Sequence, residues 1–275
     1  VVGEVTGGAI ELKGAGIAAI NGAVTARNAL KIISETDSVT VGAAADLKAK
    51  TLEVTAASDV TLAGVASVAN TASLSAGRAL SIANTGALGA SNITLSGTSV
   101  DVSGLASAAS SLTIDAGTGG ASVSGRALAD SFELRSDGTA EITGTAYGRT
   151  SLSGTASNSF TIGATGRLES GAVSIAGGSI ANAGILLSTD NLSLGSTGGA
   201  VTNSGSVVAG GALTVTGSGG LQNSGLIRAQ SFDYVSPVAL SFGASSQVVA
   251  DTLSITAPGL ANAGLILGQQ RLALN

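Results

Sequence analysis

A five-residue phrase recurs four times between residues 173 and 275, and its spacing constrains the fold more than any other feature of the chain. Each copy has an apolar residue, then Asn two residues later, then Gly two residues after that: Ile180–Gly184, Val201–Gly205, Leu221–Gly225 and Leu260–Gly264. The asparagines lie 21, 20 and 39 residues apart. The last step is nearly double the others, which indicates that one copy lacks its Asn. A fixed period near 20 residues is typical of solenoid proteins.

A second pattern carries the same period along the whole chain. In it, two apolar residues flank a polar one, and the first apolar residue marks one coil: Ile10, Leu30, Leu52, Leu74, Ile93, Leu112, Phe132, Leu152, Val173, Leu192, Leu213, Phe232, Leu253 and Leu272. A second short apolar segment follows most marks and a third is clear in the later coils, at a spacing too close for a helix between them. Stacked coils can bury an apolar face that a single coil cannot.

These patterns predict an all-β fold. We expect a single right-handed parallel β-helix, with three short strands per coil of about 20 residues and about 13–14 coils. Residues 1–275 then form one β-helix segment, which is less regular at 1–75 and regular at 80–275. The chain ends in mid-coil at Asn275, so we expect it to be an excised piece of a longer shaft.

Composition removes several classes of function. The chain contains no His and no Cys, so Ser-His-Asp and Cys-His catalysis and His or thiolate metal sites are impossible. We therefore predict no cofactor and no metal ligand. A net charge of −5 gives no basic footprint for nucleic acid. No apolar run approaches about 18 residues, so we expect no stable membrane insertion, and Val1–Glu4 does not begin a signal peptide.

The recurring asparagines are candidate structural residues. Stacked in register, Asn182, Asn203, Asn223 and Asn262 could hydrogen-bond through their amides along the coil axis as a ladder. Asn also caps turns and tolerates left-handed backbone, and the Gly two residues on would allow a positive φ. In the coil that lacks Asn, we expect Phe242 at the equivalent place, packed inward.

The polar residue of the coil pattern forms an outward column. Its first members, Glu11, Lys31 and Glu53, alternate in sign, as cross-strand pairs prefer. Later members are mostly hydroxyl residues: Ser75, Thr94, Thr113, Ser153, Ser174, Ser193, Thr214 and Ser254. Such a column is either a solvated face or a flat array that binds a ligand.

Paired carboxylates with a basic residue are the remaining catalytic option, as in enzymes that act on polysaccharides. The candidates on neighbouring coils are Asp101, Asp115, Glu133 and Glu141 with Arg126 and Arg135. However, 17 acidic residues spread over the predicted coils produce such clusters by chance. We therefore do not expect an enzyme.

The phrases Leu-x-Asn-Ser-Gly-x-Ile and Ala-Leu-Thr-Val-Thr-Gly within the 20-residue coil resemble the haemagglutinin-type repeats of filamentous haemagglutinin and related two-partner-secreted bacterial exoproteins. The stalks of contact-dependent-inhibition toxins carry similar repeats. The resemblance covers residues 80–275 well and 1–75 weakly. It implies a large adhesin that an outer-membrane transporter exports, that folds outside the cell, and that contacts a receptor or glycan on a host or bacterial surface.

The leading hypothesis is accordingly a structural and adhesive shaft at the bacterial cell surface or outside the cell, which projects binding or effector domains. A carbohydrate-binding β-helix module that uses the outward Ser/Thr face is the alternative. A polysaccharide-degrading β-helix enzyme is the third hypothesis.

Overall fold

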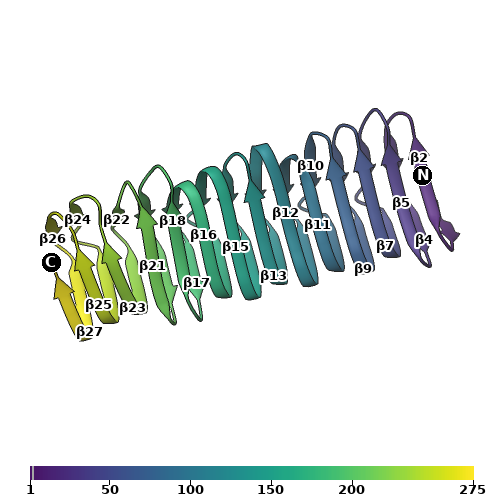
Figure 1. Cartoon of the computed structure of the whole chain (residues 1–275). Helices are drawn as coiled ribbons and strands as arrows, with labels where there is room; N and C mark the ends of the chain where they lie inside the picture. The colour runs from purple at the N-terminus through teal and green to yellow at the C-terminus, as the bar shows by residue number, and fades with distance from the viewer. Residues whose placement is uncertain (2) are drawn as a thin grey trace. The chain divides into compact units, whose positions relative to one another are not determined.

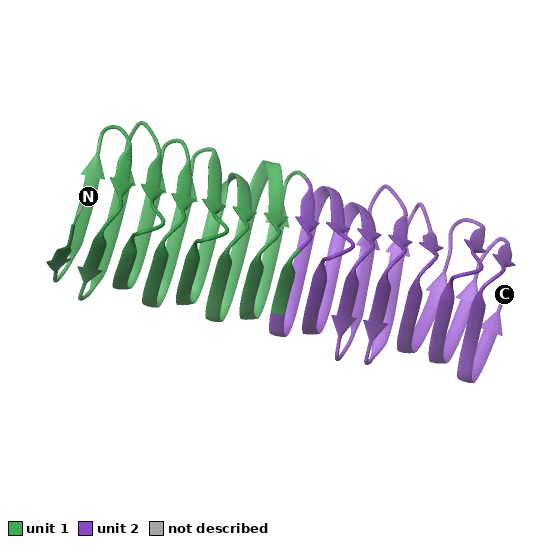
Figure 2. Ribbon diagram, turned by 180° about the vertical axis from the view of Figure 1, so that it is seen from behind, with its two compact units in different colours: residues 1–138, 144–147 green, residues 139–143, 148–275 purple. Residues whose placement is uncertain are grey.

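A computed structural model describes residue 1 and residues 3–275 of the chain. The described residues form 27 strands and no helix. The strands pair in parallel and stack as a β-solenoid of about 14 coils of about 20 residues, which Figure 1 shows. The all-β parallel solenoid predicted from the period is therefore confirmed. Residues of the chain group into two compact units, residues 1–138 with 144–147 and residues 139–143 with 148–275 (Figure 2).

In the first unit, each coil contributes three strand segments that pair with the same segments of the neighbouring coils. The first segments run from β2 through β5 and β7, the second from β3 through β6 and β8, and the third from β1 through β4 and β7. The strands are β1 Val5–Gly7, β2 Ile10–Gly14, β3 Ala18–Ile20, β4 Ala23–Ala26, β5 Ala29–Ser34, β6 Val39–Val41, β7 Asp46–Ala56, β8 Val60–Leu62, β9 Val65–Ala76, β10 Ala79–Ile82, β11 Ala87–Val102, β12 Leu105–Val123 and β13 Arg126–Ser136.

The second unit repeats this arrangement. Here β18 and β21 carry first segments, β19, β22, β24 and β26 carry second segments, and β17 and β20 carry third segments. The strands are β14 Ala140–Ile142, β15 Thr145–Ile162 (its first three residues belong to the first unit), β16 Arg167–Asn182, β17 Ile185–Ser188, β18 Leu192–Ser196, β19 Val201–Asn203, β20 Ser206–Ala209, β21 Ala212–Gly217, β22 Leu221–Asn223, β23 Leu226–Val235, β24 Leu240–Phe242, β25 Gln247–Thr256, β26 Leu260–Asn262 and β27 Leu265–Leu274.

Many segments do not end at the corners of the coil. The third segment of one coil often continues into the first segment of the next, as in β7 and β9, where the register shifts by one residue at the corner. In β11, β12 and β16 a single strand follows all three segments. The chain therefore has three pairing segments per coil, as predicted, but fewer and longer strands than three separate ones per coil.

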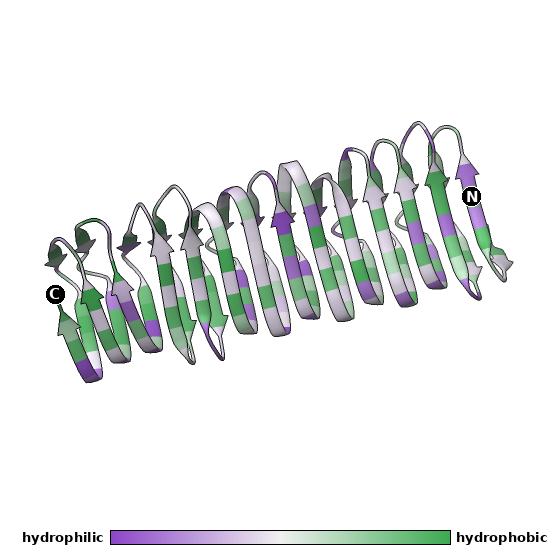
Figure 3. Ribbon diagram, in the orientation of Figure 1, coloured by the Kyte–Doolittle hydropathy of each residue, from purple (hydrophilic) through white to green (hydrophobic). Residues whose placement is uncertain are grey.

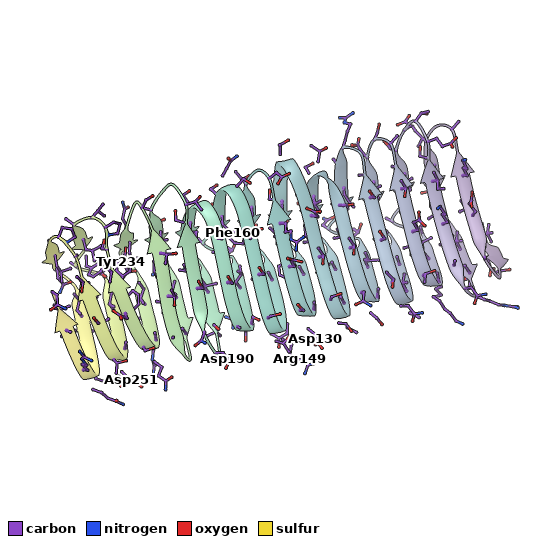
Figure 4. The ribbon with its side chains drawn as sticks, in the orientation of Figure 1. Asp130, Arg149, Phe160, Asp190, Tyr234 and Asp251 are labelled. Atoms are coloured by element: carbon purple, nitrogen blue, oxygen red, sulfur yellow. The ribbon has the colours of Figure 1, made fainter. Side chains whose placement is uncertain are left out.

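Alternation within each segment builds the core. Successive side chains of a strand point to opposite faces, and the burial pattern of β18, Leu192–Ser196, alternates buried and half-buried residues. Figure 3 shows the resulting bands of apolar and polar residues along the strands. The four phenylalanines and Tyr234 are buried, whereas Tyr147 is half-buried. Phe160 and Tyr234 are labelled in Figure 4, and Phe232 stacks on Tyr234 with 5.8 Å between ring centroids.

The pairing of neighbouring strands corrects one of the predicted coil marks, the first apolar residue of the fourth coil. Leu52 pairs with Ala72, and Ala72 pairs with Ile93, whereas Leu74 pairs with Val54. The mark predicted at Leu74 is therefore wrong by two residues and belongs at Ala72. A shift of two residues keeps every apolar side chain on the inner face, so alternation alone cannot detect it. The outward residue of this coil is accordingly Ser73, and Ser75 lies in the neighbouring column.

The glycines of the recurring phrase have a different role from the one expected. Among the described residues only Gly3, Gly120 and Gly220 have a positive φ, so Gly184, Gly205, Gly225 and Gly264 do not need left-handed backbone. Instead, a Cβ at Gly225 would meet the carbonyl oxygen of Gly205 and lie 2.7 Å from the Ser204 carbonyl carbon. These glycines therefore allow the turns of successive coils to lie directly against one another.

Replacing Gly225 with Ala should lower the stability of this turn by about 1–3 kcal/mol, because the added methyl group overlaps backbone that cannot move aside. Gly243→Ala is the matched control, since nothing lies within 4 Å of a Cβ at that position. Hydrogen exchange of residues 221–229 measures the effect. Equal exchange in the two variants would contradict the close-approach explanation.

Candidate functional site

Three of the four recurring asparagines form a chain of side-chain hydrogen bonds inside the second unit. The Nδ2 group of Asn182 donates to Oδ1 of Asn203 at 2.8 Å, and Nδ2 of Asn203 donates to Oδ1 of Asn223 at 2.7 Å. Each of these two amides also donates to a backbone carbonyl, that of Ser206 at 3.1 Å and that of Leu226 at 3.0 Å. All three asparagines are buried, so their polar groups need these partners.

The chain of amide hydrogen bonds stops at Asn223 on one end and at Asn182 on the other. Nδ2 of Asn223 donates to Oγ of Ser246 at 2.7 Å, because Phe242 occupies the place opposite Asn223 in the next coil. Phe242 is buried, as expected for the coil without Asn. At the other end, Oδ1 of Asn182 is buried without a hydrogen-bond partner.

Asn262 does not join the other three. It pairs in register with Phe242 rather than with another Asn, its side chain is exposed, and its amide bonds only to Gly264 of its own turn. The expectation of a four-member ladder is corrected here, because an apolar ring separates the fourth amide from the third.

The charged outward column lies on the first segments of the first unit. Glu11, Lys31 and Glu53 are directly opposite one another on β2, β5 and β7. The Nζ of Lys31 lies 3.0 Å from Oε1 of Glu53. Nearby, Lys13 forms an ion pair of 2.7 Å with Glu35, whose hydrogen bond and charge raise the pKa of Lys13 above its ordinary value.

Charge reversal at Lys31 should have a small effect. Lys31→Glu would place three acidic side chains in a row, at a cost of about 0.2–1 kcal/mol that falls as salt screens the charges. The double variant Lys31→Glu/Glu53→Lys should recover only part of this loss, because it restores an opposite-charge pair between positions 31 and 53 while Glu11 still faces an acidic side chain at position 31. Urea unfolding at low and at high salt measures it, and an effect that does not depend on salt would show that the column is not electrostatic.

The hydroxyl column continues on the first segments of the second unit. Ser174, Ser193 and Thr214 are opposite one another on β16, β18 and β21. Together with Ser153 and Asn191 they line a shallow hollow of about 320 Å³. The small residues Ala172 and Ala212 also line this hollow.

The acidic candidates for catalysis lie on different segments of the coil. Asp115 is opposite Arg135 on first segments, and Arg135 forms an ion pair of 2.6 Å with Glu133. Asp101 belongs to a second segment and accepts a hydrogen bond of 2.6 Å from Ser103, while Arg126 belongs to a third segment, opposite Leu105. Glu141 lies on β14, in the other compact unit. Across the described residues, no group of three or more acidic side chains is placed to hold a metal ion.

A second hollow, which the sequence patterns did not indicate, crosses the second segments of the second unit. It encloses about 500 Å³. Its floor is the outward column Thr202, Gln222 and Ser241, and the loop residues Val238 and Ala239 form one wall. We call this hollow the β19–β22–β24 groove. The one sequence signal for it is Pro237, which marks an irregular loop between β23 and β24.

Comparisons with known proteins add no family to this description. No protein-family model, curated protein or solved structure matches the chain. Within the described part of the chain there is also no helix long and apolar enough to cross a membrane.

Proposed function

We propose that this chain is part of the shaft of a bacterial surface or secreted adhesin of the filamentous-haemagglutinin type. In this role the stacked coils hold binding or effector domains away from the cell, and the outward columns contact host or bacterial surfaces. The export partner is an outer-membrane transporter of the two-partner type. The protein then acts outside the cell, without catalysis.

The observation that carries this proposal is the repetition of one coil with a buried, mainly apolar interior. Inward positions hold Leu, Ile, Val and Ala at nearly every level, and the buried Nδ2 groups of Asn182, Asn203 and Asn223 donate hydrogen bonds to neighbouring coils. Each coil contacts chiefly the coils beside it, so length can grow by repetition. The repeated phrases resemble those of secreted adhesins, which supports an extracellular shaft.

Export tests this proposal directly. The chain is placed between the secretion domain of a two-partner exoprotein and an epitope, and is expressed with the matching transporter. We expect the epitope to be exposed at the cell surface, where added protease removes it. A fusion expressed without the transporter is the control. An epitope that stays protected inside cells that contain the transporter would overturn the proposal.

Carbohydrate binding is the second candidate function. The hydroxyl column Ser153, Ser174, Ser193 and Thr214 favours it, because it lines a hollow without a charged side chain. Binding of the purified chain to a glycan array tests this function. Dose-dependent binding would support it, and an array without signal would contradict it.

A further inference from the structure

The β19–β22–β24 groove has a side wall as well as a floor. Val238 and Ala239, from the loop between β23 and β24, line the groove together with outward side chains of three neighbouring coils. Val238 is 40% exposed although it is apolar. The groove therefore combines a polar floor with an apolar side, which is the composition of sites for small ligands.

Local contacts hold this wall in place. The Oγ of Ser236 accepts a hydrogen bond from the Val238 backbone N–H at 3.3 Å and donates to the Val238 carbonyl oxygen at 2.7 Å. Val238 lies over Gly220, where a Cβ would come within 2.5 Å of its Cγ2 atom. Gly220 also has a φ of +73°, which residues with a side chain rarely adopt. Glycine is therefore required at this position both by its backbone and by the wall.

The floor offers neutral hydrogen-bonding groups. Gln222, Ser224 and Ser241 are exposed, and no hydrogen bond among the described residues involves the Gln222 side chain. The hydroxyl of Thr202 donates to the Ile180 carbonyl oxygen at 3.2 Å, so its oxygen is still free to accept. None of the residues that line the groove is charged. An ion that entered would lose water without gaining a partner of opposite charge.

We propose that the β19–β22–β24 groove binds a neutral saccharide. Hydroxyl groups of the sugar would exchange hydrogen bonds with Gln222, Thr202 and Ser241, while its C–H face would pack against Val238 and Ala239. Strands stack at about 4.8 Å, so the floor presents one polar side chain per coil along the length of an oligosaccharide. This site rests on the proposed function: it is the place where the shaft would contact a carbohydrate on another surface.

A glycan array with neutral, sialylated and sulfated oligosaccharides tests the proposal on the purified chain. We expect neutral glycans to bind and charged ones to bind less. The bound glycan is then titrated by calorimetry. Gln222→Ala/Ser241→Ala should weaken it at least tenfold, and Val238→Ser should weaken it independently by removing the apolar wall. Thr61→Ala/Ser81→Ala is the matched control and should bind as the parent chain does, because these outward residues face each other on second segments of the first unit and line neither hollow. Ser174→Ala/Ser193→Ala tests the hydroxyl column as the alternative binding site.

The outcomes distinguish binding in the β19–β22–β24 groove from binding on the hydroxyl column. All substituted residues point outward, and circular dichroism melts check that every variant folds. Binding that survives both groove variants but is lost in Ser174→Ala/Ser193→Ala would overturn this site and leave carbohydrate binding in place. Absence of any neutral-glycan signal, or a preference for charged glycans, would also overturn it. None of these results alters the export experiment, which tests the shaft separately.

Discussion

Replacing Asn203 with Asp should destabilise the second unit by at least about 3 kcal/mol at neutral pH. The substitution keeps the size of the side chain and exchanges an amide NH2 group for a carboxylate oxygen. Asn203 is 2% exposed, and its Nδ2 donates to Asn223 Oδ1 and to the Leu226 carbonyl oxygen. After the change, a buried negative charge would face both of these acceptors with no hydrogen to share.

The loss should depend on pH in a defined direction. Burial disfavours the charged form and raises the pKa of the new carboxyl group in the folded chain above its unfolded value of about 3.9. Because the folded pKa is the higher of the two, the destabilisation is smallest below the unfolded pKa and grows as pH rises from there through the folded pKa. Urea unfolding between pH 4 and 7, roughly the window between the two pKa values, measures this trend.

Gln222→Glu is the matched control for Asn203→Asp. It makes the same amide-to-carboxylate change one residue from Asn223 on β22, but its side chain is exposed, so its effect should stay within about 0.5 kcal/mol. Solenoids need not unfold in one step, so hydrogen exchange of residues 201–226 should accompany the urea curves. If Asn203→Asp were as stable as Gln222→Glu, the amide chain would not stabilise the stack.

Replacing Phe160 with Ala should lower the free energy of unfolding by about 3–5 kcal/mol, the range for truncating a buried aromatic side chain to Ala. Phe160 is fully buried (Figure 4). Its ring fills the space above Gly154, where a Cβ would lie 2.8 Å from the Cζ atom of the ring. In other coils the residue at the phase of Gly154 is large and apolar, such as Ile114, Ile175 and Leu194. In this coil the space that a side chain of the first segment fills elsewhere is filled by the ring of Phe160 from the second segment.

This exchange predicts strong coupling between the two positions. Gly154→Leu alone should destabilise by about 1–3 kcal/mol or more, because the added side chain overlaps the ring. The double variant Gly154→Leu/Phe160→Ala should recover most of the loss, since it restores the side-chain arrangement of neighbouring coils. A double-mutant cycle by urea unfolding measures the coupling, with Ser153→Ala as the exposed control. Additive losses would show that the ring does not occupy the space over Gly154.

Periodicity made much of the interior predictable. Each inward position repeats about every 20 residues, so the sequence alone places Leu192, Leu213 and Leu253 in one column, as the pairing confirms. The doubled Asn-to-Asn step placed Phe242 opposite Asn223 for the same reason. These predictions succeed because the coils are equivalent, and an equivalent residue meets an equivalent environment.

Register and turn geometry were less accessible. Alternation cannot distinguish Ala72 from Leu74 as the start of a segment, because both face inward. The same holds for the glycines of the recurring phrase, since composition does not tell a positive φ from a close approach of two backbones. Gly225, in the phrase, lies against the backbone of the neighbouring coil, whereas Gly220, just before the phrase, has a positive φ. Only the positions of the neighbouring coils distinguish these two roles.

By itself, then, the repeating phrase with Asn and Gly determined the architecture: a parallel solenoid with an apolar interior and small turns. It did so because a short coil has one way to bury its apolar residues, which is against copies of itself. Tertiary structure decided which amides meet, that Asn262 is separated from Asn223 by a ring, and that a loop after β23 turns flat sheet into a groove. Those features depend on contacts between different coils, and a period describes only what the coils share.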